Sequence, residues 1–288
     1  MTTVLNIIIG GLIMGGIYAL ISMGLSLQYG VARILNVSHG EFIMLAAFLT
    51  WTLVVLGGVH PLLALVICGP AAFAIGFVLH ITVYRWLKKF SASAGVFEGN
   101  AMLLSFGLMF ILSNVGQKIW GSQLKGYDYL KYTVNVLGTE TAANKIFVLF
   151  IALLICALFY IFLSRSRMGK SIRAASQDPT AASMMGIKIN KIMAISFGIG
   201  AVLAGTAGSL ISMYNQISTR MGMQYTVIAL IVVVLGGMGS IPGSIIGGLI
   251  LGMVGSLFAY IAPDLTMVAY YTIILALLLV RPKGLLGR

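Results

Sequence analysis

The chain has 288 residues, of which 60% are hydrophobic and only 8% are charged, and its mean hydropathy is +1.06. A typical soluble domain carries roughly 25% charged residues, so this composition excludes an ordinary soluble globular protein. The formal net charge of +12 is spread over polar segments between apolar runs. Because nucleic-acid-binding domains gather their basic residues on one face, this distribution argues against that class.

The apolar runs predict an all-α, polytopic membrane bundle of eight or nine spans with broken or re-entrant segments and no soluble domain. A hydrocarbon core about 30 Å thick needs roughly 20 apolar residues per helix. The candidate spans are 4–29, 41–57, 62–84, 101–117, 146–163, 192–213, 226–237, 244–261 and 266–280. Run 226–237 is short, which favours a broken or re-entrant segment. Run 4–29 is rich in glycine, which predicts a bend or a split.

The beginning of the chain lacks the basic stretch of a cleaved signal peptide, so run 4–29 is expected to remain as a span. Segments 85–89, 165–191 and 281–288 are rich in lysine and arginine, and the positive-inside rule assigns them, with the C-terminus, to the cytoplasm. Segment 118–145 has mixed charge and is assigned to the outside. Nine spans place the N-terminus outside and eight place it inside, and both alternatives stay open.

The sequence lacks the patterns of a catalytic or metal site. Gly169-Lys170-Ser171 resembles the end of a nucleotide-binding loop, but Ser164 stands where the first glycine is required. His39-Gly40-Glu41 supplies too few ligands for a metal ion, and no HExxH pattern occurs. We therefore expect a protein that is not an enzyme and binds no cofactor itself. Since few ionisable residues fall inside the spans, the energy for any transport is expected to come from outside the chain.

Segment 164–191 is a polar island between two apolar runs. Asp178-Pro179 is a strong helix start, because Asp caps free N–H groups and Pro suits the first helical position. A short helix from Pro179 to about Met185 is expected to end at Gly186. One interpretation is a basic cytoplasmic loop that only fixes topology. The other is a docking surface for a second protein, whose close approach is allowed by the small residues Ala174, Ala175, Ala181, Ala182 and Ser183.

Two glycine-containing interruptions, 30–40 and 236–242, break the apolar pattern in the two halves of the chain. Paired interruptions point to a transport path in transporters built from repeats. One hypothesis is that polar and small residues of the two interruptions face one another across a central cavity, and these are Asn36, Ser38, His39, Gly40 and Glu41 with Gly236, Gly237, Gly239 and Ser240. The alternative is that they only satisfy the broken backbone. The spacings Gly243–Gly247 and Gly248–Gly252 predict close helix packing.

Three blocks carry a resemblance to a known family, in the family's order: GGIYALISMGLSLQYGVARILNVSHGEFIMLAAF, MGKSIRAASQDPTAASMMGI and LGGMGSIPGSIIGGLILG. From about residue 10 to 287 the chain resembles the permease subunit of branched-chain amino acid ABC importers. The resemblance implies one transmembrane permease domain over 1–288, with a cytoplasmic ATPase-coupling loop at 164–191. It assigns the following residues to the coupling helix or its surroundings: Arg173, Asp178, Pro179, Ala181, Ala182 and Gly186.

The resemblance also implies a location and partners. It implies a bacterial inner membrane protein that pairs with a homologous permease and with two cytoplasmic ATPase subunits that use ATP and Mg. A periplasmic or extracellular binding protein would deliver an amino-acid-like solute. Branched-chain amino acids, other amino acids and urea-type amides remain alternatives for the cargo, and a homodimer and a heterodimer both stay open. The rival classes are an ion-coupled secondary transporter or channel for small polar solutes, and a membrane enzyme, for which no catalytic constellation is found.

Overall fold

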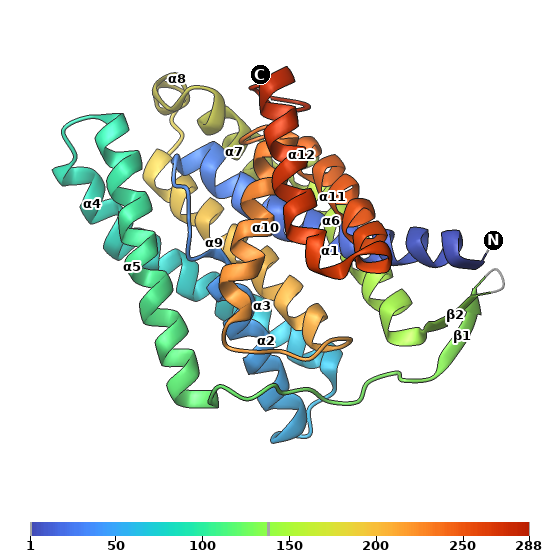
Figure 1. Cartoon of the computed structure of the whole chain (residues 1–288). Helices are drawn as coiled ribbons and strands as arrows, with labels where there is room; N and C mark the ends of the chain where they lie inside the picture. Colours follow the sequence, from blue (N-terminus) through green and yellow to red (C-terminus); the bar gives the residue numbers. More distant parts are fainter. Residues whose placement is uncertain (1, 137–138, 288) are drawn as a thin grey trace.

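The computed structural model describes residues 2–136 and 139–287, so residue 288 of the predicted basic tail lies outside it. The described residues form a helical bundle with one short hairpin (Figure 1). The elements are α1 (Thr2–Ala32), α2 (His39–Val55), α3 (Pro61–Leu79), η1 (His80–Tyr84), α4 (Arg85–Phe90), α5 (Ala94–Trp120), β1 (Thr133–Val136), β2 (Thr139–Ala142), α6 (Ala143–Arg165), α7 (Arg167–Gln177), α8 (Pro179–Met184), α9 (Ile189–Ser212), α10 (Met221–Gly236), α11 (Ile241–Ile261), η2 (Pro263–Leu265) and α12 (Thr266–Val280).

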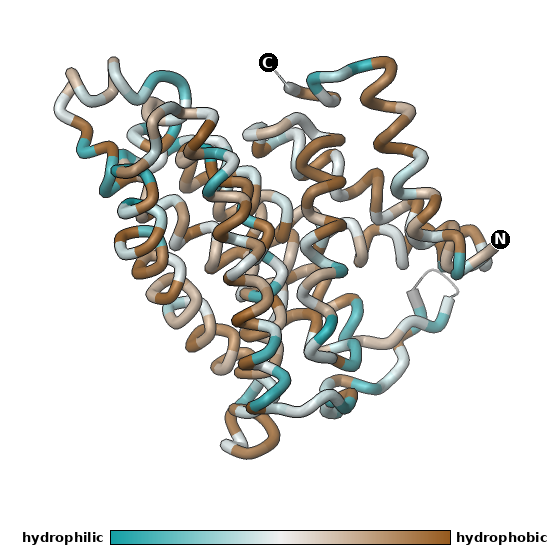
Figure 2. Tube along the Cα trace, turned by 60° about the vertical axis from the view of Figure 1, so that its left-hand side comes forward, coloured by the Kyte–Doolittle hydropathy of each residue, from teal (hydrophilic) through white to brown (hydrophobic). Residues whose placement is uncertain are grey.

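Among the described residues, seven helices or continuous helical rods are long and apolar enough to cross a membrane, and α2 and α10 are shorter apolar helices. This confirms the predicted polytopic all-α bundle and the short element near 226–237. Hydrophobic residues dominate the helices and hydrophilic ones concentrate at turns and ends (Figure 2). Helix α9 is the most enclosed of the seven and α12 the least.

Helix α1 is a single helix of 31 residues, so the prediction that its glycines split it is wrong. The glycines instead let α1 lie against α11, its most extensive packing partner. Added Cβ atoms on Gly11 and Gly15 would strike the backbone of α11 at Met253 and Leu249. In an apolar medium every backbone group must be satisfied internally, which favours an unbroken helix over a split one.

Glycines of α11 make the close helix contacts that their spacing predicts. Gly248 meets Ala19 of α1, Gly252 meets Gly15 of α1, and Gly247 lies against Val232 of α10. Small residues allow backbones to approach and gain dispersion contacts where the surrounding lipid offers no hydrophobic driving force. The prediction of close packing at these spacings is therefore confirmed.

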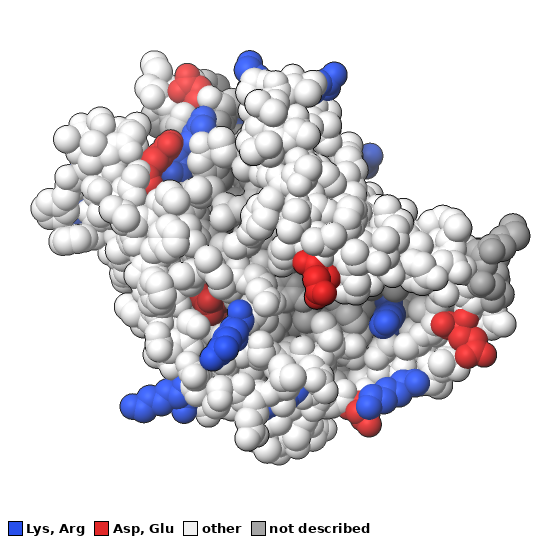
Figure 3. Space-filling model, viewed as in Figure 1, with Lys and Arg blue, Asp and Glu red and all other residues white. Residues whose placement is uncertain are grey.

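The three basic segments lie at one end of the bundle, where Figure 1 places α4, α7, α8 and the C-terminus. Lys88 and Ala175 line one cavity there, and Arg173 and Leu286 line another. Charged side chains are sparse on the face seen in Figure 3. The shared end agrees with the prediction that one side of the membrane holds all three segments.

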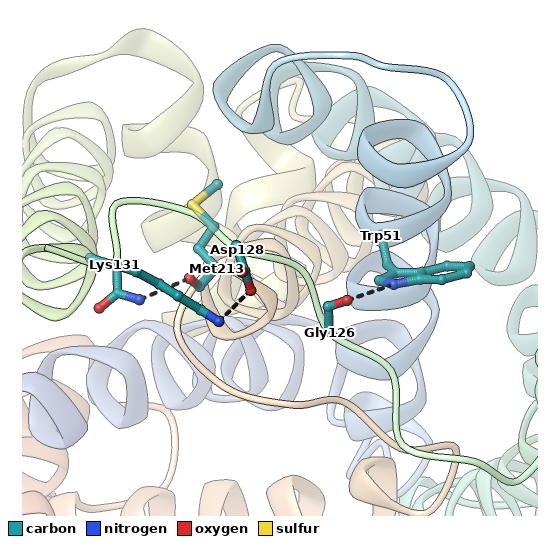
Figure 4. A network of polar contacts seen from close by, with 6 residues as sticks. Trp51, Gly126, Asp128, Lys131 and Met213 are labelled. Atoms are coloured by element: carbon teal, nitrogen blue, oxygen red, sulfur yellow. Dashed lines mark hydrogen bonds and ion pairs between the residues drawn. The ribbon is translucent and has the colours of Figure 1, made fainter.

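At the opposite end a strap, residues 121–132, crosses the tips of α2 and α9. Figure 4 shows Trp51 Nε1 donating to the Gly126 carbonyl at 3.2 Å, beside an ion pair between Lys131 and Asp128. The strap also pairs with the loop before α10, because Lys125 and Ile217 exchange backbone hydrogen bonds of 3.0 and 2.8 Å. These contacts fix the strap on the bundle.

Candidate functional site

The polar island folds as two short helices joined at Asp178. Asp178 Oδ1 accepts hydrogen bonds from Thr180 N at 2.8 Å and Ala181 N at 3.0 Å, which satisfies two free donors at the start of α8. Gly186, with a φ of +84°, ends the turn in the left-handed region. The predicted start and stop are confirmed, and α8 covers Pro179–Met184.

Helices α7 and α8 each have one face buried against the bundle and one face exposed. Met184 and Met185 are each 84% exposed at the tip of α8. Ala175 and Ala182 are buried against the bundle. The expectation that these two alanines admit another protein is therefore wrong, because they are used to seat α7 and α8 on their own chain. The outer face keeps Ala181 and Ser183 exposed.

The first interruption is an irregular segment, residues 33–38, between α1 and α2. Asn36 Nδ2 donates to Gln28 Oε1 at 3.1 Å, and Asn36 Oδ1 accepts from Ser38 N at 3.2 Å and Ser38 Oγ at 2.6 Å. Val37 N donates to Ser105 Oγ at 3.0 Å. Asn36 and Ser38 are both buried. Side chains thus satisfy backbone that has left the helix, as irregular backbone at membrane depth requires.

The start of α2 lies directly against the first turns of α10. Gly40 N donates to Thr226 Oγ1 at 2.9 Å, and the same hydroxyl lies 3.1 Å from the Val37 carbonyl. A Cβ on Gly40 would collide with the Gly222 carbonyl, so only glycine fits this approach. Gly222 in turn lies under the Glu41 carboxyl group, which occupies the space of a side chain there.

His39 and Glu41 are buried polar groups with incomplete hydrogen bonding. His39 Nε2 lies 3.1 Å from the Ile21 carbonyl, while His39 Nδ1 and Glu41 Oε2 have no partner among the described residues. Within residues 2–136 and 139–287, no three His, Cys, Asp or Glu side chains gather as metal ligands would. Buried ionisable groups in a span are costly, so their presence at a helix break marks this region as a candidate for function.

The second interruption separates α10 from α11 and is held by the C-terminal tail. Gly237 has a φ of +101°, a conformation that suits glycine. Leu285 N donates to the Leu235 carbonyl at 2.9 Å, and Leu286 N donates to the Gly236 carbonyl at 3.0 Å. The tail therefore satisfies carbonyls that the last turn of α10 leaves free.

Residues 36–41 of the first interruption do not face residues 236–240 of the second, contrary to the hypothesis of a shared central cavity between them. Gly40 contacts Thr226, and the ten-residue rise from there to Gly236 along α10 is about 15 Å. Gly239 lies instead against Gly30, at the end of α1. The reason is that α10 is continuous between the two positions, so it holds them at different depths.

One cavity of ≈ 810 Å³ is lined both by residues predicted for the transport path and by a residue predicted for the coupling loop. Gly239 and Ser240 line it together with Arg173. Ser240 begins α11 by accepting from Gly243 N at 3.2 Å, and Arg173 Nη2 donates to the Ser164 carbonyl at 3.0 Å. The structure thus brings the second interruption close to the polar island and to the start of the first interruption, where Gly30 and Arg33 also line the cavity.

Sequence reasoning missed four residues that hold the first interruption: Gln28, Ser105, Gly222 and Thr226. Gln28 lies near residues 33–38 on α1, whereas Ser105, Gly222 and Thr226 come from α5 and α10, far away in the chain. The available signal was a polar side chain inside an apolar run, as at Gln28 and Thr226, since such groups are expensive in a membrane unless they have partners.

The protein belongs to a family of transport permeases. The branched-chain amino acid transport system permease component family matches residues 7–280. It is therefore a membrane permease of that family, with several membrane-crossing helices.

Named relatives agree over nearly the whole chain. The high-affinity branched-chain amino acid transport system permease protein LivH of Escherichia coli K12 is 31% identical, covering 96% of this chain and 94% of its own. The corresponding protein BraD of Pseudomonas aeruginosa is 32% identical, with 98% and 95% coverage. The fructose import permease protein FrcC of Rhizobium meliloti is 25% identical, with 87% and 74% coverage.

Proposed function

We propose that this protein is the permease subunit of an ATP-driven importer for branched-chain or related amino acids. The observation that carries the proposal is α8, a capped helix on the outside of the bundle that ends in exposed Met184 and Met185. Adjacent exposed methionines suit an apolar groove on another protein, because their flexible side chains adapt to it. The names of LivH and BraD supply the substrate class.

The polar island would act as a lever between an ATPase and the spans. Asp178 and Pro179 start α8, Gly186 ends it, and Ala181 lies on its exposed face. Ala182 seats α8 on the bundle, and Arg173 anchors α7 near the end of α6. Because α7 packs on α1, α6 and α9, a displacement of α8 reaches the spans through rigid helices.

The end that carries α4, α7, α8 and the tail would face the cytoplasm, with the C-terminus. Three lysine- and arginine-rich segments share this end, which supports the orientation through the positive-inside rule. With α2 and α10 counted as crossing elements, the order of helices then puts the N-terminus outside. In a bacterial cell the membrane would be the inner membrane.

Partner subunits would complete the transporter. The family supports ATP-binding and substrate-binding partners in general, and we propose two cytoplasmic ATPases, a homologous permease and a periplasmic or extracellular binding protein. ATP and Mg would be used by the ATPases, because this chain carries no complete nucleotide-binding loop. The polar residues at the break before α2 would border the path of the solute: Asn36, Ser38, His39, Gly40 and Glu41.

Two other interpretations make different predictions. The buried groups around Asn36 already have several internal partners, which favours a purely structural role for that residue. Glu41, buried without a partner for Oε2 among the described residues, favours an ion-coupled carrier, in which a buried carboxylate exchanges a cation. An ion-coupled carrier would transport without ATP, whereas the proposed importer would not.

Recovery of partner subunits from native membranes tests the proposal. The variant is Asp178→Arg with Gly186→Trp, which places charge and bulk on α8. The matched control is Asp264→Arg with Gly121→Trp at the opposite end. Asp264 is exposed, and Gly121, like Gly186, has a positive φ and no atom within 4 Å of an added Cβ. We expect wild type and control to recover an ATPase and the α8 variant to lose it. Equal recovery by all three, or no ATPase with wild type after mild crosslinking, would overturn the proposal.

A further inference from the structure

The cavity of ≈ 810 Å³ has features that the proposed amino acid transport does not explain. It lies between the ends of α1, α6, α7 and α11, and its size falls within the range of about 300–1,000 Å³ of small-molecule sites. Arg33 and Arg173 line it, and no Asp or Glu is among its lining residues. The neighbouring cavity of ≈ 420 Å³ differs, because Glu98 there accompanies Arg33 and Lys88. The larger cavity therefore has two positive lining residues and no negative one, whereas the smaller has two positive and one negative.

Arg33, which lines both cavities, has an unusual backbone conformation. Its φ of +55° lies in the left-handed region, which residues other than Gly, Asn and Asp seldom adopt. The guanidinium lies 5.7 Å from the centre of the Tyr29 ring, a cation–π distance. The only ion pair among the described residues joins Lys131 and Asp128, so Arg33 has no acidic partner there.

An independent observation comes from Ser26, which also lines the cavity. Its side chain is fully buried, and its Oγ has no hydrogen-bond partner among the described residues. A buried hydroxyl without a partner costs free energy, and a ligand oxygen would remove that cost. At another wall, the N-terminus of the 21-residue helix α11 contributes Ser240 and Ile241, and helix N-termini favour anions.

The cavity has apolar as well as polar walls. Tyr160, Leu163 and Ile241 are among the lining residues, and the neighbouring surfaces of α6 and α11 expose Ile161 and Ile246. The apolar walls contribute nothing to the binding of a free, fully hydrated anion, whereas the acyl chains of a lipid gain from burial against them. Basic pockets between transmembrane helices bind the headgroups of anionic lipids for this reason.

We propose that this cavity binds the phosphate ester of an anionic phospholipid. Arg33, Arg173 and the Ser26 hydroxyl would donate to the phosphate oxygens, and the chains would lie along α6 and α11. The lipid would belong to the cytoplasmic leaflet. This location rests on the proposed orientation of the permease, whereas the binding itself does not. Since Arg173 lies on α7 and Gly239 at the second interruption, a bound lipid would join the polar island to the spans.

Native mass spectrometry tests this on the full-length chain, purified with whatever subunits accompany it. The probes are phosphatidylglycerol and phosphatidylcholine, with glycerol 3-phosphate as a soluble competitor. Arg33→Asn removes the charge but keeps a residue that tolerates positive φ, and Ser26→Ala removes the hydroxyl. Arg85→Asn is the matched control, an equal charge change at the same end outside the cavity. No ATP is added, so failure here leaves the transport proposal untouched.

We expect wild type and Arg85→Asn to bind phosphatidylglycerol about tenfold more tightly than phosphatidylcholine, as one charge-assisted contact warrants. Arg33→Asn and Ser26→Ala should lose most of that preference. Ser26→Ala should also melt at a higher temperature than wild type without lipid, because it removes an unpaired buried hydroxyl. Unchanged preference in both cavity variants would overturn the site. Displacement of the lipid by millimolar glycerol 3-phosphate would overturn the lipid as its source.

Discussion

Glu41 and Gly222 pack so closely that the Glu41 side chain leaves room only for glycine at position 222. The carboxyl group of Glu41 occupies the volume where a side chain at position 222 would project, and a Cβ there would come closer than 3.0 Å to the carboxyl atoms. Glu41 lies on α2 and is buried against α10, so it has little room to move. The glycine therefore belongs to the site as much as the carboxylate does.

Gly222→Ala should lower the free energy of unfolding by about 1–3 kcal/mol, because overpacking forces backbone or side chains to shift. Adding Glu41→Ala should recover most of this loss, since the two changes share one volume. The measurement is denaturation in detergent, compared with Gly107→Ala, where an added Cβ meets nothing within 4 Å. A Gly222→Ala variant as stable as Gly107→Ala would contradict the packing described here.

Among the elements, α8 is a short helix whose start depends on a single side chain, Asp178. A helix of 6 residues has few internal hydrogen bonds, and Asp178 satisfies two of the donors at its start. Short isolated helices are marginal in water, so the cap and the seat of Ala182 on the bundle decide whether α8 keeps its shape.

Asp178→Ala should weaken α8 by about 1 kcal/mol, which corresponds to roughly fivefold faster exchange of its amide hydrogens. Asp178→Asn should leave exchange unchanged, because asparagine caps as well as aspartate does. Hydrogen exchange over residues 179–185 measures this directly. Equal exchange in wild type and both variants would show that the cap does not hold the helix. Faster exchange in Asp178→Asn as well as in Asp178→Ala would assign the effect to the charge of Asp178.

Local signals in the sequence predict elements such as α8 well, and long-range packing explains where prediction fails. Asp178, Pro179 and Gly186 each act on their immediate neighbours, so their effect can be read from a short segment. The glycines of α1 carry a local signal for a break, yet they lie inside an unbroken helix, where they allow close contact with α11. The depth difference between Gly40 and Gly236 depends on the unbroken course of α10, which no local pattern contains.

At the scale of the whole molecule, one end differs from the other in charge and in contacts. Basic segments, the C-terminal tail and both described cavities lie at the end that carries α7 and α8 (Figure 1). The opposite end is covered by the strap, which Trp51 and Ile217 attach to the bundle (Figure 4). This asymmetry suits a transporter that receives its solute at one face and its energy at the other.

Uptake of radiolabelled leucine into proteoliposomes tests the central claim most directly. The transporter would be reconstituted with its co-purified subunits and binding protein, with ATP supplied to the ATPase side, and compared with the Asp178→Arg, Gly186→Trp variant and its matched control. We predict uptake that requires ATP, persists in the control and is lost in the α8 variant. Uptake by this chain alone, driven by an ion gradient without ATP and unaffected by the α8 changes, would contradict the proposed importer.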